Sequence, residues 1–201
     1  MKHIPAFLVA ALLLTACSSS HKKIDIFLKG SATIDKDNRV VTLKDGPGST
    51  QETIDFTVTS AVTLKVVKAD GSTVSFDFPD NGYYVINAKN DTTIGGMEHF
   101  VITQTRADTV RQATIQRSID SLQQMVDNKN ISAANHSFFI LPWQSVKVTT
   151  NPDATIIAPF HQLHSIENSG DKEPEVYRFY SIQEVRQRIT TQKELTIAPK
   201  I

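Results

Sequence analysis

The feature that most constrains the fold is a two-residue alternation of apolar and polar side chains, repeated along residues 24–105. In one stretch Ile54, Phe56 and Val58 alternate with polar residues. Successive side chains of a strand point to opposite faces, so this period indicates strands with one buried face. About seven such stretches, separated by turn residues, are typical of an antiparallel sandwich. The expected strands are residues 24–29, 39–43, 54–59, 62–66, 74–78, 83–87 and 99–103.

Short turn sequences between these stretches predict how the strands connect. Asp70-Gly71 separates two alternating stretches, and Asp-Gly is a strong hairpin signal because a tight primed turn needs positive φ. Asp80-Asn81-Gly82 is a second such turn, and residues 35–38 are a looser one. The clusters Gly46-Pro47-Gly48 and Gly95-Gly96 match no dinucleotide-binding or phosphate-binding motif, so we expect them in turns at strand ends.

The pattern changes near residue 108. Residues 108–128 contain neither glycine nor proline, and apolar side chains recur every three or four residues, which indicates an amphipathic helix about 30 Å long. This stripe could form a coiled coil with a partner, but it covers only about two heptads, so packing on the chain's own sheet is favoured. The stripe consists of Ile115, Ile119, Leu122 and Val126.

The remainder of the chain returns to β character. Residues 176–180 predict a strand, and Ser181 with Glu184 three residues later forms a capping box that opens a final helix. The chain is therefore predicted to be mainly β and α+β overall. An antiparallel β-sandwich-like domain over residues 24–105 is followed by a long helix and a small α+β part within residues 106–201. Other apolar runs, interrupted by prolines, are residues 138–141, 146–149 and 154–158.

The N-terminus has the layout of a secretory signal peptide. Met1-Lys2-His3 is cationic, residues 4–14 are apolar, and two small residues precede Cys17, the only cysteine of the chain. A transmembrane helix needs about 20 apolar residues to cross a bilayer. The apolar segment is shorter, so we expect it to direct export rather than to span a membrane.

Leu14-Thr15-Ala16-Cys17 resembles the lipobox of bacterial lipoproteins, a resemblance confined to the leader. In that class the cysteine thiol receives a diacylglyceryl group, and the freed amine is acylated after cleavage. The resemblance implies that residues 1–16 are removed, that Cys17 carries the lipid and that residues 17–23 tether the body to a lipid bilayer. Because Ser18 rather than an acidic residue follows the cysteine, it also implies delivery to the outer membrane, on the periplasmic side or at the surface.

Composition excludes several kinds of site. Since Cys17 is used by the anchor, the body has no disulfide and no thiolate metal ligand. The chain carries 21 basic and 21 acidic residues and no basic block beyond Lys22-Lys23, so nucleic acid is not an expected partner. No motif indicates a cofactor.

Histidines and serines are the residue types that could provide catalysis or metal binding. His161 and His164 are the closest pair, with His99 and His136 as distant additions. Their spacing would place the pair on one face of a helix but on opposite faces of a strand, and the surrounding residues favour strand or loop. We therefore expect no metal site. There is also no Gly-x-Ser-x-Gly elbow, and no catalytic residue is assigned.

Aromatic residues are the remaining candidates for contact with a ligand or partner. Trp143 is the first choice, because tryptophan combines a large apolar area with a polar N–H group. Tyr83 and Tyr84 are the others, and as neighbours in an expected strand they cannot both belong to the core. The alternative is that most of these rings pack inside.

Together these features predict a membrane-anchored lipoprotein of the cell envelope with a noncatalytic binding or assembly role, whose partner is an envelope protein or glycan. One alternative is a lipid-anchored hydrolase acting on envelope polymers or exported peptides. A deep pocket holding His161 or His164 beside a carboxylate would favour the hydrolase. Another alternative is a carbohydrate-binding module, which would need a row of exposed aromatic rings.

Overall fold

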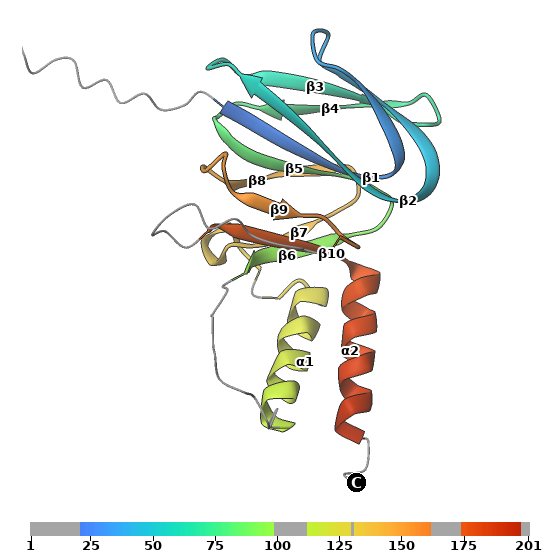
Figure 1. The fold of residues 1–201 in the computed structure, drawn as a ribbon, viewed down its shortest axis with the longest axis vertical. Helices are drawn as coiled ribbons and strands as arrows, with labels where there is room; N and C mark the ends of the chain where they lie inside the picture. Colours follow the sequence, from blue (N-terminus) through green and yellow to red (C-terminus); the bar gives the residue numbers. More distant parts are fainter. Residues whose placement is uncertain (1–20, 99–111, 130, 162–173, 198–201) are drawn as a thin grey trace, which may run out of the picture.

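The computed structural model describes residues 21–98, 112–129, 131–161 and 174–197. Within these residues the protein is mainly β, with two sheets and two short α-helices (Figure 1). The strand order is β4-β3-β2-β1-β5-β8 in the first sheet and β7-β6-β10-β9 in the second. The strands are β1 (His21–Asp35), β2 (Val40–Thr57), β3 (Val62–Val67), β4 (Thr73–Phe78), β5 (Gly82–Ala88), β6 (Thr93–Glu98), β7 (Ser137–Ile140), β8 (Gln144–Thr149), β9 (Thr155–Ile157) and β10 (Val176–Ser181). The helices are α1 (Gln112–Val126) and α2 (Ile182–Ile197), and a 3-10 turn, η1, covers Ala133–Asn135.

The first sheet is covered on both faces at its centre, whereas β3 and β4 are buried on one face only. It curls nearly closed around one apolar cluster, into which Ile24, Ile26 and Leu28 of β1 point. Phe27 points the other way, toward the second sheet, where its ring lies 5.4 Å from that of Phe179. A fully buried apolar side chain contributes about 1.5–3 kcal/mol. Because both faces are covered, every residue of β5 is buried and that strand has no solvent-facing side.

Six of the seven expected strand segments lie in strands β1 to β5, but they do not make an antiparallel sandwich of their own. Strands β1 to β5 lie in one sheet, and two of its pairs, β1 with β5 and β2 with β3, are parallel. The alternation decides which face a side chain occupies, not which strand lies beside it. The turn at Asp70-Gly71 makes the predicted hairpin of β3 and β4. The turn at Asp80-Asn81-Gly82 instead joins β4 to β5, which are not neighbours.

Both sheets contain strands from each side of the boundary expected between residues 105 and 106. β6 lies in the second sheet between β7 and β10, whereas β8 completes the first sheet beside β5. The first strand begins at His21 rather than at Ile24. The strand predicted for residues 99–103 lies outside the described residues. The sheets therefore do not divide the chain at the expected boundary.

Gly46-Pro47-Gly48 lies inside β2 and not at a strand end. The register of β1 against β2 shifts around Gly30, which leaves residues 45–48 bulged out of the ladder. Gly30 has a φ of 98°, and a side chain there would overlap the backbone of Lys44. A bulge bends its strand and accommodates proline, which cannot donate a hydrogen bond to the ladder.

Gly95 and Gly96 likewise lie within β6, where a turn was expected. Gly95 pairs with Phe179 of β10, and a Cβ on Gly95 would overlap the Phe179 ring. Phe179 is fully buried between the sheets. The missing side chain gives this ring its space, so the glycine is required by packing.

The predicted long helix is wrong. The structure has two short helices, with α1 containing 15 residues, and residues 108–111 lie outside the described part. Ile119 of the predicted stripe packs on Val185 and Ile189 of α2, in a cluster that Tyr180 of β10 also contacts, so this part of the stripe meets another helix. Figure 1 shows the two helices side by side, beyond the second sheet. None of the helices in the described ranges has the length and apolar character needed to cross a membrane.

The capping box predicted for the start of α2 is confirmed. The Ser181 backbone N–H donates to Oε2 of Glu184 at 2.8 Å, and the Glu184 N–H donates to Oγ of Ser181 at 3.1 Å. Both donors would otherwise be unpaired at the first turn. The helix therefore begins directly at the end of β10.

Replacing Gly95 by alanine is expected to lower the free energy of unfolding by about 1–3 kcal/mol, because its Cβ would overlap Phe179. Urea unfolding measures this. In a Phe179→Ala background, which removes the ring but leaves the Arg178 carbonyl 2.5 Å from the added Cβ, the same change is expected to cost at least about 0.5 kcal/mol less. Gly48→Ala is the control, since no atom lies within 4 Å of its Cβ and its cost comes from positive φ alone. Equal costs of Gly95→Ala in the two backgrounds would contradict the overlap.

Candidate functional site

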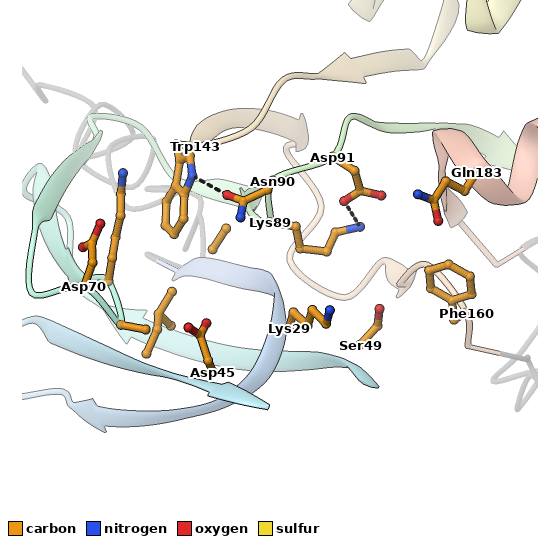
Figure 2. Close-up of a pocket in the computed structure, with 14 residues that line it drawn as sticks. Lys29, Asp45, Ser49, Asp70, Lys89, Asn90, Asp91, Trp143, Phe160 and Gln183 are labelled. Carbon is orange, nitrogen blue, oxygen red and sulfur yellow. Dashed lines mark hydrogen bonds and ion pairs between the residues drawn. The ribbon is translucent and has the colours of Figure 1, made fainter. Parts of the chain in front are cut away.

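A groove of about 580 Å³ opens where β5 ends (Figure 2). Its lining comes partly from strands β1, β2 and β5, and partly from the β3–β4 turn, the β5–β6 loop, and the residues just before β8 and just after β9. The first turn of α2 adds Gln183. Such a site depends on the packing of both sheets and could not be located from any one segment. Its charged residues are Lys29, Asp45, Lys68, Asp70, Lys89 and Asp91.

Trp143 lies at one end of the groove. Its ring is half-buried against the apolar cluster of the first sheet, and its Nε1 donates to Oδ1 of Asn90 at 3.3 Å. Its backbone N–H donates to the carbonyl of Asn87 at 2.8 Å, and Nζ of Lys68 lies 4.2 Å from the ring centroid. These contacts fix the position of the ring. That Trp143 contacts a ligand stays a prediction.

Phe160 lies at the other end of the groove (Figure 2), with 57% of its surface exposed. Its backbone N–H donates to Oε1 of Glu184 at 2.9 Å, so the carboxylate that caps α2 also positions this residue. Phe160 is not predicted from the sequence. The capping box is a local sequence pattern. The additional hydrogen bond from Phe160 to Glu184 joins residues that only the tertiary fold brings together.

Both aromatic residues have a backbone conformation that bulky side chains rarely adopt. The φ angle is 59° for Trp143 and 63° for Phe160. The left-handed region costs a residue with a Cβ about 1–2 kcal/mol, because Cβ approaches the following carbonyl. Such strain persists where surrounding contacts impose it, and it is concentrated at functional sites.

Lys89 is a buried cation in the lining between these two rings. It is 6% exposed, and its Nζ lies 3.2 Å from Oδ1 of Asp91. Burial lowers the pKa of Lys89, and the Asp91 carboxylate opposes that shift. No further group among the described residues accepts a hydrogen bond from Nζ. Since an ammonium has three N–H donors, Lys89 has N–H donors that lack an acceptor among the described residues.

Tyr83 and Tyr84 are both in the core, so the expectation that one of them faces outward is wrong. They are 3% and 5% exposed. Tyr84 packs inside the curled sheet, 4.8 Å from the ring of Phe78, while Tyr83 faces the second sheet. Period two places neighbours on opposite faces, but here both faces are covered. Neither ring is presented to a partner at the surface.

Tyr83 instead belongs to a buried polar network around Asp25. Its hydroxyl donates to Oδ2 of Asp25 at 2.9 Å, while Gln51 Nε2 and Thr53 Oγ1 donate to the same carboxylate at 2.6 Å each. Burial raises the pKa of Asp25 although these hydrogen bonds lower it. Burial, together with the Asp25 charge, also raises the pKa of Tyr83. These hydrogen bonds connect β1 with β2 and with β5.

A second polar cluster lies at the start of β10, away from the groove. Tyr177 donates to Oε1 of Glu175 at 2.7 Å, and Asn151 donates to Oε2 at 2.8 Å. Although burial alone would raise the pKa of Glu175, hydrogen bonds from Thr149, Tyr177 and Asn151 hold it below its usual value. Burial and Glu175 raise the pKa of Tyr177 to about 12. The cluster joins the β8–β9 loop to β10.

The described histidines do not converge on one point. Nδ1 of His161 lies 3.0 Å from the carbonyl of Pro159, and Nδ1 of His136 lies 3.3 Å from the hydroxyl of Tyr177. His99 and His164 lie outside the described residues. Within the described part of the chain, no group of three or more His, Cys, Asp or Glu side chains could hold a metal ion.

The chain matches no protein-family model, and it has no match among curated proteins or solved structures. The side chains of the groove combine two positioned aromatic rings with paired and unpaired charges.

The Asp25 network predicts a dependence of stability on pH. The folded-state pKa lies above the unfolded value of 3.8, so the fold binds this proton more tightly than the unfolded chain does. The stabilisation is present below that value and is lost as pH rises through the folded pKa. The free energy of unfolding of the wild type, relative to Asp25→Asn, is therefore expected to fall as pH rises above about 4.

Urea unfolding at a series of pH values measures this difference. Asp77→Asn, which removes an exposed carboxylate of β4, is the matched control and should show no comparable trend. A wild-type to Asp25→Asn difference that does not change with pH would rule out the proton linkage.

Proposed function

We propose that the protein is a lipid-anchored lipoprotein of the cell envelope, delivered to the outer membrane, with a noncatalytic binding or assembly role. In this proposal Cys17 carries the lipid, and the groove between Trp143 and Phe160 holds an envelope ligand. The observation that carries the proposal is the position of the groove, which lies at the end of the central strands opposite to the end nearest Cys17.

The start of β1 is close to the proposed anchor along the chain. β1 begins at His21, four residues after Cys17. Four extended residues span at most about 14 Å, so acyl chains on Cys17 would keep this end of the first sheet near the bilayer. Two or more acyl chains make such attachment stable.

The groove lies at the far end of the same strands. β1 and β5 run parallel, with Lys22 opposite Gly82 at the anchored end and Leu28 opposite Ala88 at the other. A rise of about 3.3 Å per residue places these two ends about 20 Å apart. Ala88 lines the groove. An anchored body would therefore offer its groove on the side distant from the lipid.

The groove lining supports binding over hydrolysis. Hydrolytic mechanisms place a nucleophile or a water molecule beside a base. Among the described residues, no histidine lines the groove, and His161 contacts the carbonyl of Pro159 instead. The Lys89 and Asp91 side chains are ion-paired with each other. Two positioned aromatic rings with polar groups between them are the usual components of a ligand-binding cleft.

Cys17→Ser is expected to abolish incorporation of labelled fatty acid and to move the protein from the membrane fraction to the soluble fraction, because the acceptor thiol is missing. Metabolic labelling and cell fractionation measure the two effects. Ser18→Ala is the control and should remain labelled and membrane-bound. Full labelling of the Cys17→Ser variant would remove the basis of the anchoring proposal.

The binding role predicts that a solubilised fraction of the cell envelope stabilises the full-length protein. A ligand at about 100 times its Kd contributes about 2.7 kcal/mol, or a rise in Tm of about 5–10 °C for a chain of this size. Phe160→Gly should not show this rise. Without the envelope fraction its Tm should equal that of the wild type, since glycine readily adopts the φ of 63° found there.

Leu141→Ala, which truncates another exposed apolar side chain outside the groove lining, should respond like the wild type. Mass spectrometry of the bound material before and after incubation tests the noncatalytic part of the proposal. Steady conversion of that material to a product would favour the hydrolase.

A further inference from the structure

We infer that the groove binds a neutral saccharide, an inference that rests on the proposed binding role and specifies its ligand class. Each sugar hydroxyl both donates and accepts hydrogen bonds, so a saccharide suits a site in which both kinds of group are present. The C–H groups on one side of a sugar ring can also pack on the electron-rich face of an aromatic ring.

Donors and acceptors are both available between the two aromatic ends of the groove (Figure 2). Lys29 and Lys89 supply N–H donors, and Asp45 and Asp91 supply carboxylate oxygens. The side chains of Lys29 and Asp45 make no hydrogen bond or ion pair with any other described residue. Lys29 and Asp45 can therefore bind hydroxyls without first breaking a contact with another described residue.

Lys89 is the most specific of these donors. Its ammonium is buried and has only the Asp91 carboxylate as a partner among the described residues. A buried polar group that lacks hydrogen bonds is costly, so an acceptor that reaches Nζ stabilises the complex. A hydroxyl or ring oxygen can accept this hydrogen bond without adding a charge to the groove.

The charge of the lining favours a neutral ligand. Three lysines and three aspartates give a formal charge of zero. A polyanion would meet the carboxylates of Asp45, Asp70 and Asp91, while a polycation would meet the lysines. Binding that depends on clustered charge of one sign is therefore disfavoured.

The shape of the lining favours a saccharide over a peptide. Extended peptides are recognised by pairing with a sheet edge or by inserting apolar side chains into pockets. The groove is lined partly by loops, and apart from Trp143 and Phe160 its apolar side chains are small or few. They are Leu43, Ala69 and Ala88.

Phe160 supplies the aromatic face. Trp143 already has the Lys68 ammonium over its ring and the apolar cluster beneath it, so it can offer mainly its edge. Phe160 is more than half exposed, and its backbone is held by Glu184. The sugar ring nearest α2 is therefore expected to stack on Phe160.

Calorimetric titration of the full-length lipoprotein in detergent micelles tests this inference. The probes are neutral trisaccharides of glucose, mannose and N-acetylglucosamine, with trigalacturonate as the acidic probe and a capped, uncharged tripeptide as the peptide probe. At least one neutral trisaccharide is expected to bind with a Kd of about 1 mM or lower. Its affinity should be unchanged by added salt, because a neutral ligand brings no charge to be screened.

Three variants and one control assign that binding to the groove. Phe160→Gly and Lys89→Met are each expected to weaken binding of the neutral trisaccharide by about tenfold. The first variant loses the stacking surface, and the second loses the buried donor. Phe160→Tyr should bind within about threefold of the wild type, because the aromatic face remains. Leu141→Ala should bind like the wild type. The Tm of each variant, measured without sugar, establishes that it is folded.

Tighter binding of trigalacturonate than of the neutral trisaccharides would overturn the inference. So would a neutral-trisaccharide affinity that Phe160→Gly leaves unchanged. Binding of the tripeptide alone, lost in Phe160→Gly, would also overturn it but would leave the binding role of the groove intact. If no probe binds and no envelope fraction raises the Tm, the inference and the proposed function both fail.

Discussion

Burial on both faces of β5 and of residues 24–28 of β1 is the constraint on which the rest of the structure depends. One face of each strand closes the interior of the curled sheet, and the other packs on the second sheet. Polar groups of these strands must then be satisfied internally. Lys22 donates to the carbonyl of Val58 and to Asn81, and Asp25 accepts three hydrogen bonds. The central strands are therefore fixed by polar contacts as well as by apolar packing.

The groove is a consequence of how the chain leaves these strands. Beyond β5 it crosses to the second sheet within a few residues, and that crossing carries Lys89 and Asp91. The bulge in β2 brings Asp45 to the same place, and the segments around Trp143 and Phe160 reach it in a strained backbone conformation. Irregular backbone held by a rigid scaffold is a common way to build a binding surface.

Local patterns predict local structure in this chain. The alternation located β3 and β4, Asp70-Gly71 placed their hairpin, and Ser181 with Glu184 located the start of α2. Features that depend on distant partners were not predictable. The parallel pairing of β1 with β5, the burial of Tyr83 and Tyr84, and the position of Phe160 all arise from contacts between segments far apart in the sequence. Trp143 was singled out by residue type alone, and only the fold places it in the groove.

The carboxylate of Glu184 links the first turn of α2 to the segment that follows β9. One oxygen caps the helix, and the other holds the peptide N–H of Phe160. A tilt of the helix pair would thus be transmitted to the rim of the groove through this side chain, and through Gln183, which lines the groove itself. By thermodynamic reciprocity, any protein that displaced these helices would alter ligand affinity by the same factor as the ligand alters the affinity for that protein.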